Sequence, residues 1–567
     1  MKPSFSAAAV LPSIALAANQ VLLGPVFEAP SNVSNELSIQ KEVEGFGGCL
    51  NHVLQTGKTP FGAEIDGNDT AVSVTVLQGA DAQPLLDYHH TPVNLNVSAG
   101  SVTNVSSSSM YRIGSVSKLL TMYAILVNNG SQIYNSLVTD FVPELKDASS
   151  NNTSLIDAVQ WDEVTVGALA SHLSGLGRDY NNGDLSYLDI PPAAVGLPDL
   201  LSDEVPTCGV EFFSGITQRH PIFLPYTTPI YSNAAYRILG YVLENITGTS
   251  FHEAYNDTIF QPIGMENTRT LLPEKHGVGV ITPGLSGWDF DMGDEIPTGG
   301  IYSSSGDLAK LGQAILSNKQ LPSVETRQWM KPHTHTSSLT FSVGAPWEIW
   351  RTRSNITSGR TIDLYTKSGS IGQYSSVLIL VPDQDLVVSV LAAGADSASL
   401  KNTASELAVQ RLLPELENVA RTRACGKFCG LYKAANSSLN STLELDVDGD
   451  PGLRVKSWIN RGVDFFKVAQ EYADSTKGGK VTSMRLYPSN IRNETVASYR
   501  AIIATQPYGN HTEVPRIFDD AASQWGKIDQ LMYGNIAVDD FIFHLDEEGV
   551  AQSVEARVMR AGALVKV

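Results

Sequence analysis

A serine and a lysine three residues apart are the first pair in this sequence that could do chemistry. Ser115 and Lys118 open a stretch with helical periodicity, so one helical turn places both side chains on the same face, within reach of proton transfer. The field at a helix N-terminus also favours a developing serine alkoxide. Alone, this pattern is very common and far more often marks a solvated helix start. A nucleophilic serine therefore needs support from other motifs.

Two further motifs carry side chains suited to the same chemistry. Tyr231 and Asn233 flank Ser232 in a tight turn before a helix-like segment, which lets a phenol and an amide face one cleft; a loop tyrosine with a capping Asn is the plainer interpretation. Lys367 places a cation on an apolar strand, and Gly369 would let a substrate approach the strand edge closely. A Lys-Ser-Gly interruption of such a strand is costly unless it serves a function.

The order and spacing of these motifs resemble the serine β-lactamase and penicillin-binding-protein family, especially class C β-lactamases and their esterase relatives. Residues 168–176 are similar to the family's helix ending in a Ser-Gly-Leu turn, and residues 298–307 to its Gly-Gly…Ser…Asp segment. The resemblance covers residues 37–420. It implies an α/β (α+β) fold of β-lactamase/transpeptidase type, with an antiparallel sheet flanked by helices and a helical subdomain.

The resemblance also implies catalytic roles. Ser115 would be the acylated nucleophile, and Lys118 would take its proton as a neutral amine, favoured by burial and by the nearby Lys367 cation. Tyr231 would relay protons to the leaving group and help to activate the deacylating water. Lys367 would lower the pKa of Tyr231 and attract a substrate carboxylate. The predicted catalytic residues are therefore Ser115, Lys118, Tyr231 and Lys367.

Four more residues would bind the substrate. Asn233 would hydrogen-bond its acyl part, and the backbone N–H groups of Ser115 and Ser370 would form an oxyanion hole. Gly369 would leave room beside the strand. Ser368 stands where the family more often has Thr, which keeps a hydroxyl group. The resemblance implies no metal and no organic cofactor.

Composition and charge narrow the classes of partner. The chain has 567 residues, a net charge of −20 and a hydrophobic fraction of 42%, which is ordinary for globular domains and excludes disorder as the main state. The acidic balance argues against nucleic acid and anionic membrane surfaces. No run of apolar residues reaches the length of a membrane span. A small-molecule acyl substrate is the expected partner, and the sequence does not indicate the oligomeric state.

Two features predict secretion. Residues 1–17 combine a basic start, a short apolar core and an Ala-Leu-Ala cleavage site, the pattern of a signal peptide. Fourteen of the thirty Asn residues lie in Asn-x-Ser/Thr sequons, against roughly one in seven expected by chance. Glycans would also explain how a chain with only 17% charged residues stays soluble. We therefore expect a secreted eukaryotic glycoprotein.

The four cysteines suit two disulfide bonds in an oxidising compartment. Their sequence positions allow three connectivities. Cys425 and Cys429 are close enough in sequence to pair locally, which would leave Cys49 to pair with Cys208.

Hydrophobic patterns indicate the elements that position the motifs. Polar and apolar residues alternate over 71–77, as in a half-buried strand. Over 116–127 apolar residues recur at helical spacing, and Asn129-Gly130 would end this helix. Residues 365–380 and 386–393 predict a hairpin, and 397–420 a long helix. Beyond it, short alternating runs predict an all-β, barrel-like tail, similar to the appendix of secreted fungal members of the family. The domains are thus a signal peptide (1–17), a catalytic domain (18–420) and a β-rich domain (421–567).

The sequence favours a secreted serine hydrolase acting through an acyl-serine on a small ester or amide. An α/β-hydrolase would need Gly-x-Ser-x-Gly, which is absent from the sequence. An acyltransferase, a true β-lactamase or a D-aminopeptidase could use the same site. A binding protein without activity on this fold is the alternative from another class, and the intact motifs argue against it.

Overall fold

The computed structural model describes residues 22–81, 83–151, 154–180, 191–200, 212–353, 359–506 and 524–567. The chain divides into two compact units: residues 31–351 with 363–412, and residues 1–30 with 352–362 and 413–567. The predicted signal peptide lies outside the described residues. In the described ranges, we find no helix long and apolar enough to span a membrane.

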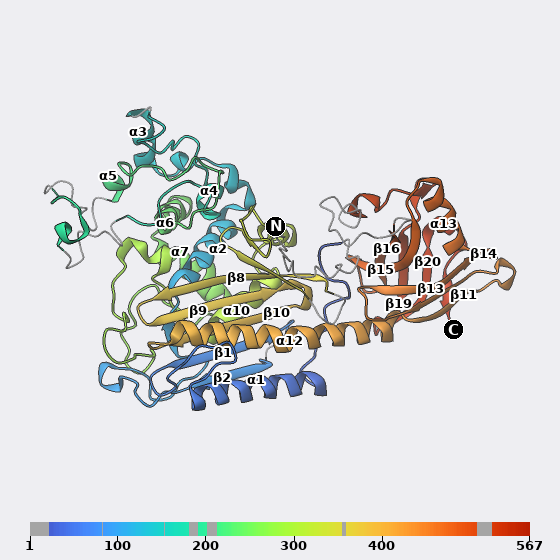
Figure 1. Cartoon of the computed structure of the whole chain (residues 1–567), viewed down its shortest axis with the longest axis horizontal. Coiled ribbons are helices and arrows are strands. Elements are labelled where there is room, and N and C mark those ends of the chain that lie inside the picture. The colour runs from blue at the N-terminus through green and yellow to red at the C-terminus, as the bar shows by residue number, and fades with distance from the viewer. Residues whose placement is uncertain are drawn as a thin grey trace, which may run out of the picture. The chain divides into compact units, whose positions relative to one another are not determined.

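The larger unit is built on an eight-stranded sheet whose central strands are antiparallel and fully buried (Figure 1). Its order is β2 (Leu86–His90), β1 (Ala71–Gln78), β10 (Leu386–Ala393), β9 (Tyr374–Val381), β8 (Thr361–Ile371), β7 (Glu348–Arg353), β6 (Phe341–Val343) and β5 (Thr334–His335). This confirms the predicted sheet. The prediction of a half-buried β1 was wrong, because this strand lies between β2 and β10 and all its residues are buried.

Helices form the rest of the larger unit. The segments that matter for the site are α1 (Leu37–Thr56), α2 (Ser117–Asn129), α4 (Val166–Ala170), α6 (Asn233–Thr247), α9 (Ile296–Gly299), α10 (Ser305–Leu316) and α12 (Ser397–Phe428). α10 packs on β1, β9 and β10, while α2, α4, α6 and α9 pack against one another as a helical subdomain (Figure 1). The helix predicted over 397–420 continues to Phe428, and the run 365–380 contains the end of β8, a turn and nearly all of β9.

The smaller unit contains the predicted barrel. Its antiparallel strands close in the order β12 (Thr442–Asp446), β11 (Gly430–Ala434), β21 (Leu564–Lys566), β20 (Ala551–Ala556), β19 (Asp540–Leu545), β16 (Val496–Gln506), β15 (Lys480–Arg492), β13 (Leu453–Asn460) and back to β12. Closure leaves no unpaired sheet edge in the ring. The all-β expectation missed helix α13 (Phe465–Ser475), whose apolar residues Phe465, Ala469 and Ala473 are buried at helical spacing.

The predicted disulfide pairing is confirmed in part. Cys425 and Cys429 form a disulfide at the end of α12. Cys49 on α1 forms no disulfide within the described residues, and its sulfur accepts a hydrogen bond from Arg411 Nη2 at 3.2 Å. Cys208 lies outside the described residues, so its pairing with Cys49 stays a prediction.

Candidate active site

Helix α2 carries Lys118 into the interior and holds Ser115 at its start. Residues 114–116 form a single 3₁₀ turn that leads into α2, and the helix is buried from Ser117 to Leu126. Gly130 ends it, as the sequence predicts, by donating its N–H to Leu126 O at 2.7 Å. Lys118 is fully buried, whereas Ser115 is partly exposed. The nucleophile candidate thus faces solvent while its partner does not.

The turn that holds Tyr231 is fixed by the serine between Tyr231 and Asn233. Ser232 is the N-cap of α6, with Oγ accepting the Ala235 N–H at 3.0 Å and donating to Gly177 O at 2.8 Å. Capping leaves Tyr231 just before the helix and Asn233 as its first residue. The turn therefore belongs to the helix start and has a defined direction.

Strand β8 passes very close to the turn before Ser115. A Cβ atom at Gly369 would lie 2.1 Å from Ile113 O and 2.7 Å from Ser115 N. Gly114 has φ +49°, and a Cβ there would lie 2.5 Å from Ser370 N. Both contacts require glycine. The backbone of Ser370, which is exposed, is thus held beside the Ser115 turn, although the sequence argument assigned the space at Gly369 to the substrate.

Ser115 is hydrogen-bonded to two of the predicted residues. Tyr231 OH donates to Ser115 Oγ at 2.6 Å, and Lys118 Nζ lies 3.1 Å from the same oxygen. Lys118 also donates to Asn233 Oδ1 at 2.7 Å and to Thr298 O at 2.6 Å. Two motifs separated by more than 100 residues therefore meet at one hydroxyl group.

The surroundings of Lys118 favour its neutral form. Burial lowers the pKa of Lys118 from its ordinary 10.5 to about 8; Tyr231 opposes the shift and the Lys367 cation adds to it. Burial alone would raise the pKa of Tyr231, but Lys367 and Lys118 outweigh it, so this pKa falls below 10.0. Their Nζ atoms lie 5.3 and 5.0 Å from the centre of the Tyr231 ring. Beside one serine, the site thus holds a phenol that is more acidic than usual and an amine that is less basic than usual.

Lys367 has a carboxylate partner that the sequence argument missed. Its Nζ donates to Glu348 Oε1 at 2.6 Å, and Glu348 Oε2 accepts from Ser368 N at 2.9 Å and from Ser368 Oγ at 2.7 Å. Burial would lower the pKa of Lys367, yet Glu348 outweighs it and raises the pKa above 10.5. Lys367 therefore stays charged. Glu348 lies on β7, and no motif marks it; only the strand pairing brings it to Lys367.

Asn233 is held more tightly than the resemblance implies. While its Oδ1 accepts from Lys118, its Nδ2 donates to Asp179 Oδ1 at 2.6 Å. One of the two Nδ2 hydrogens is left for an acyl group. Asp179 also pairs with the exposed Arg178 at 3.3 Å. The sequence argument passed over this aspartate, which follows the Ser-Gly-Leu turn by three residues.

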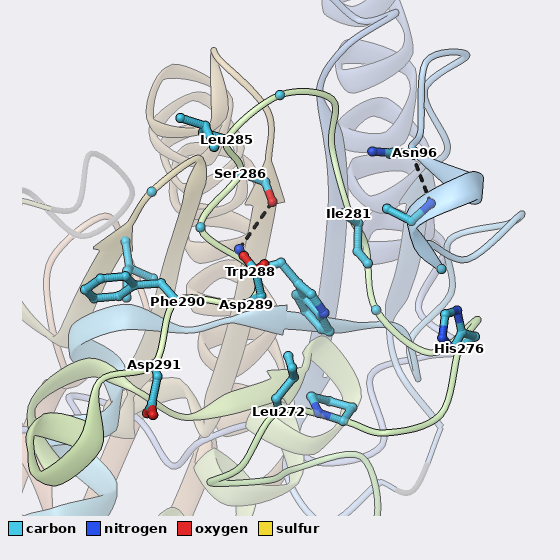
Figure 2. Close-up of a pocket in the computed structure, with 18 of the residues that line it drawn as sticks. Asn96, Leu272, His276, Ile281, Leu285, Ser286, Trp288, Asp289, Phe290 and Asp291 are labelled. Carbon is cyan, nitrogen blue, oxygen red and sulfur yellow. Dashed lines mark hydrogen bonds between the residues drawn. The ribbon is translucent and has the colours of Figure 1, made fainter.

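A pocket of about 1000 Å³ lies beside the end of β8 (Figure 2). Ile371 and Gly372 line it next to Ser370, and in Figure 2 Trp288 lies between Leu272 and Ile281. None of the predicted site residues is among those that line it.

The segment that forms one wall of this pocket is tied to the strand ahead of Ser115. The guanidinium of Arg112 donates to the carbonyl oxygens of Gly287, Trp288 and Phe290 at 3.1, 3.2 and 2.6 Å. This wall is therefore anchored to the strand that leads to Ser115.

Comparison with known proteins agrees with this architecture. The family model described as Beta-lactamase matches residues 85–412, and the model described as Beta-lactamase-like-like, C-terminal domain matches residues 420–566.

Among curated relatives, the Beta-lactamase-like protein of Arthroderma benhamiae is 27% identical over 96% of this chain and 95% of its own length. The Probable hydrolase clz13 of Cochliobolus lunatus is 27% identical over 80% of this chain and 76% of its own. A solved structure of a beta-lactamase/D-alanine carboxypeptidase from Yersinia pestis is 18% identical, covers 67% of this chain and 99% of its own, and has a TM-score of 0.49. Since the first model alone matches more than half of the 567 residues, the chain belongs to the beta-lactamase family.

Proposed function

We propose that this chain is a secreted serine hydrolase that acts through an acyl-serine on a small ester or amide. The observation that carries the proposal is the pair of hydrogen bonds on Ser115 Oγ, from Tyr231 at 2.6 Å and Lys118 at 3.1 Å. A serine hydroxyl is a weak nucleophile until a neighbouring base takes its proton. Here two candidate bases with lowered pKa values touch the same oxygen.

Acylation needs one base and one oxyanion site. Lys118, as a neutral amine, accepts the Ser115 proton while Oγ attacks the substrate carbonyl carbon. Negative charge develops on the carbonyl oxygen, which the N–H groups of Ser115 and Ser370 would stabilise. The bond to the leaving group then breaks, and Tyr231 returns a proton to that group. The products are an ester on Ser115 and a free alcohol or amine.

Deacylation reuses the same groups. Tyr231, ionised by this transfer, accepts a proton from a water molecule that attacks the acyl ester. When the intermediate collapses, the bond between the acyl carbon and Ser115 Oγ breaks, Lys118 returns its proton to Oγ, and the acid is released. Lys367, held charged by Glu348, stabilises the phenolate throughout. The charge on Lys118 also favours the phenolate during the first step.

Hydrolysis of an activated short-chain acyl ester tests the proposal. The secreted protein is compared with its Ser115→Ala variant, and intact mass after a short incubation reports an acyl adduct. We expect turnover and an adduct in the wild type and neither in the variant. Turnover that survives Ser115→Ala would assign the activity to another site.

The same experiment separates the related activities. Turnover of a β-lactam or of a D-aminoacyl amide above that of the ester would indicate a β-lactamase or a D-aminopeptidase. An adduct that is released only when an alcohol or amine acceptor is added would indicate an acyltransferase. A folded protein that gives neither adduct nor turnover with any of these probes would favour a binding protein.

Secretion is part of the proposal. It is supported by the signal-peptide pattern and by sequon asparagines that are exposed in the structure, among them Asn32, Asn68 and Asn436. We expect the secreted protein to lose mass on N-glycosidase treatment and to begin near Ala18. An unglycosylated protein retained in cells would contradict this part and leave the chemistry untouched.

A further inference from the structure

Beneath Tyr231 lies a buried histidine that the mechanism above does not use. His172 is 5% exposed and stacks on the Tyr231 ring with a centroid distance of 4.6 Å and an interplanar angle of 28°. It also lies 5.4 Å from the ring of Tyr236 on α6. Its imidazole is therefore held between the tyrosine of the site and the helix that follows it.

The same imidazole anchors the turn that carries Tyr231. His172 Nδ1 accepts the backbone N–H of Ser232 at 3.1 Å, and His172 O accepts that of Ile230 at 2.8 Å. His172 thus accepts hydrogen bonds from the backbone of both residues that flank Tyr231. Since Nδ1 is the acceptor, the proton of the neutral ring is on Nε2, which has no hydrogen-bond partner in the described structure.

The backbone at His172 also points to a constrained position. Its φ is +60°, in the left-handed region that non-glycine residues enter rarely, with His, Asn and Asp enriched there. His172 directly follows Ser171, the C-cap of α4, whose N–H donates to Gly167 O at 3.0 Å. An unusual conformation kept at the end of a short helix beneath the site is consistent with a role in it.

We propose that His172 is a positioning residue for Tyr231. Its ring backs the phenol and its Nδ1 fixes the turn, so that the Tyr231 hydroxyl stays on Ser115 Oγ between the cations of Lys118 and Lys367. The inference rests on the proposed function, since it gives His172 no contact with substrate and no proton of its own to transfer.

The charges around His172 keep it neutral in this role. Burial first, and then the cations of Lys118, Lys367 and Arg178, lower the pKa of His172 well below 6.5. These cations come from α2, from β8 and from the segment before α6, and Tyr231 and Tyr236 face the ring from α6 and its N-terminal turn. The imidazole ring therefore stacks on Tyr231 in its uncharged form at neutral pH.

Two substitutions separate the two contacts. His172→Asn tolerates a positive φ and keeps an acceptor near Ser232 but removes the ring. His172→Phe keeps a ring and removes the acceptor. Without the ring, water reaches Lys118 and the Tyr231 hydroxyl moves from the cations, and both changes raise the pH at which a free base forms.

The test measures the pH dependence of kcat and KM for the ester, with folding checked by thermal melting. For His172→Asn we expect the acidic limb of kcat to move up by about one pH unit, which lowers kcat about tenfold below that limb, with KM changed less than about threefold. His172→Phe should keep the limb within about 0.3 pH units and lose less than about fivefold in kcat. His333→Phe, at a His–Tyr ring pair outside the site (5.2 Å from Tyr134), is the control and should keep the wild-type profile.

Two results would overturn the inference. If His172→Asn and His172→Phe melt at lower temperature but keep the wild-type pH profile, His172 is only structural. If His172→Phe moves the limb as far as His172→Asn, the ring does not back Tyr231. A wild type whose turnover equals that of Ser115→Ala would instead refute the proposed function, so the two failures are distinguishable.

Discussion

Charged side chains are arranged in opposite ways in two regions of this chain. In the barrel, Arg454 pairs with Asp446 at 2.5 Å and with Asp448 at 3.3 Å, while Arg485 pairs with Asp448 at 2.7 Å and with Asp450 at 3.0 Å. In the larger unit, Lys118 is fully buried, and the three hydrogen bonds described for it all go to uncharged oxygens.

The difference shows how cationic side chains can serve structure or chemistry. Arginine keeps its proton in a protein and here its charge is matched by carboxylates, so the barrel pairs hold strands together without becoming reactive. Uncharged oxygens compensate a buried ammonium only in part, and its neutral form becomes accessible near physiological pH. The lowered pKa of Lys118 thus follows from burial without an adjacent carboxylate among the partners described for it.

Removal of Lys118 should have the largest effect. For Lys118→Met we expect kcat/KM for the ester to fall about a thousandfold or more, because the base is lost while the apolar stem still fills the space. Measurement of kcat/KM for ester hydrolysis checks this prediction, with the fold of the variant verified by circular dichroism. A loss below tenfold would mean that Tyr231 alone serves as the base.

The pH dependence tests whether Lys118 must be neutral. Because its pKa is about 8, the fraction of free amine should grow roughly 50-fold between pH 6 and pH 8, and kcat/KM should rise with it before levelling off. A profile already flat from pH 6 upwards would contradict the role of an uncompensated lysine. Lys118→Met should lack this rise.

Glu348→Gln removes the carboxylate partner of Lys367, so that Lys367, like Lys118, has no adjacent carboxylate. Without the carboxylate, Lys367 loses the partner that keeps it charged, and the phenolate of Tyr231 loses support; kcat/KM should fall roughly tenfold to hundredfold. Urea unfolding should show a loss of about 3 kcal/mol, since a buried charge is left unpaired. Asp363→Asn, which breaks the nearby pair of Asp363 with Arg351 (2.9 Å), is the matched control and should leave activity unchanged.

The ion pair of Glu348 with Lys367 also determines how the stability of the fold depends on pH. Burial would raise the pKa of Glu348, but Lys367 outweighs it, so the pKa in the folded state is below 4.5. The pair therefore stabilises the fold fully above pH 4.5, and this stability is lost as the pH falls through the lower, folded value. Glu348→Gln should flatten that part of the stability curve, and an unchanged curve would contradict the pairing.

Arg454→Met should have the smallest effect. It removes one partly exposed partner from the network, so we expect a loss of at most about 1 kcal/mol, reduced further by salt, and unchanged kcat/KM. Thermal melts at low and high salt check this. A drop in activity would show that the barrel charges matter for the site.

Much of the site follows from local patterns in the sequence. Ser115 with Lys118 and Tyr231 with Asn233 sit at helix starts, where short-range rules fix side-chain directions, and the structure brings both pairs together. Glu348 and His172 did not emerge as functional candidates. Glu348 meets Lys367 only through the pairing of β7 with β8, and His172 meets Tyr231 only because two separate segments stack. Such contacts depend on tertiary register, which one sequence does not encode locally.

The same limit explains the fold-level differences. The alternation of residues 71–77 suggested one wet face, yet a strand between two neighbours and under a helix is buried on both faces. Helix α13 was missed because its apolar positions lie among turn-rich strand signals. The barrel itself was predictable, because closed antiparallel sheets repeat short alternating runs.

The contact between Gly369 and the Ser115 turn has a consequence for anyone who redesigns this enzyme. A methyl group at position 369 would lie 2.1 Å from Ile113 O, so the site has no room for a carbon atom there. Libraries that vary the neighbouring Ser368 and Ser370 can explore new substrates, whereas every alternative at 369 moves the strand away from Ser115. Position 369 should therefore stay glycine in such a library, because we expect variants with any other residue there to be inactive.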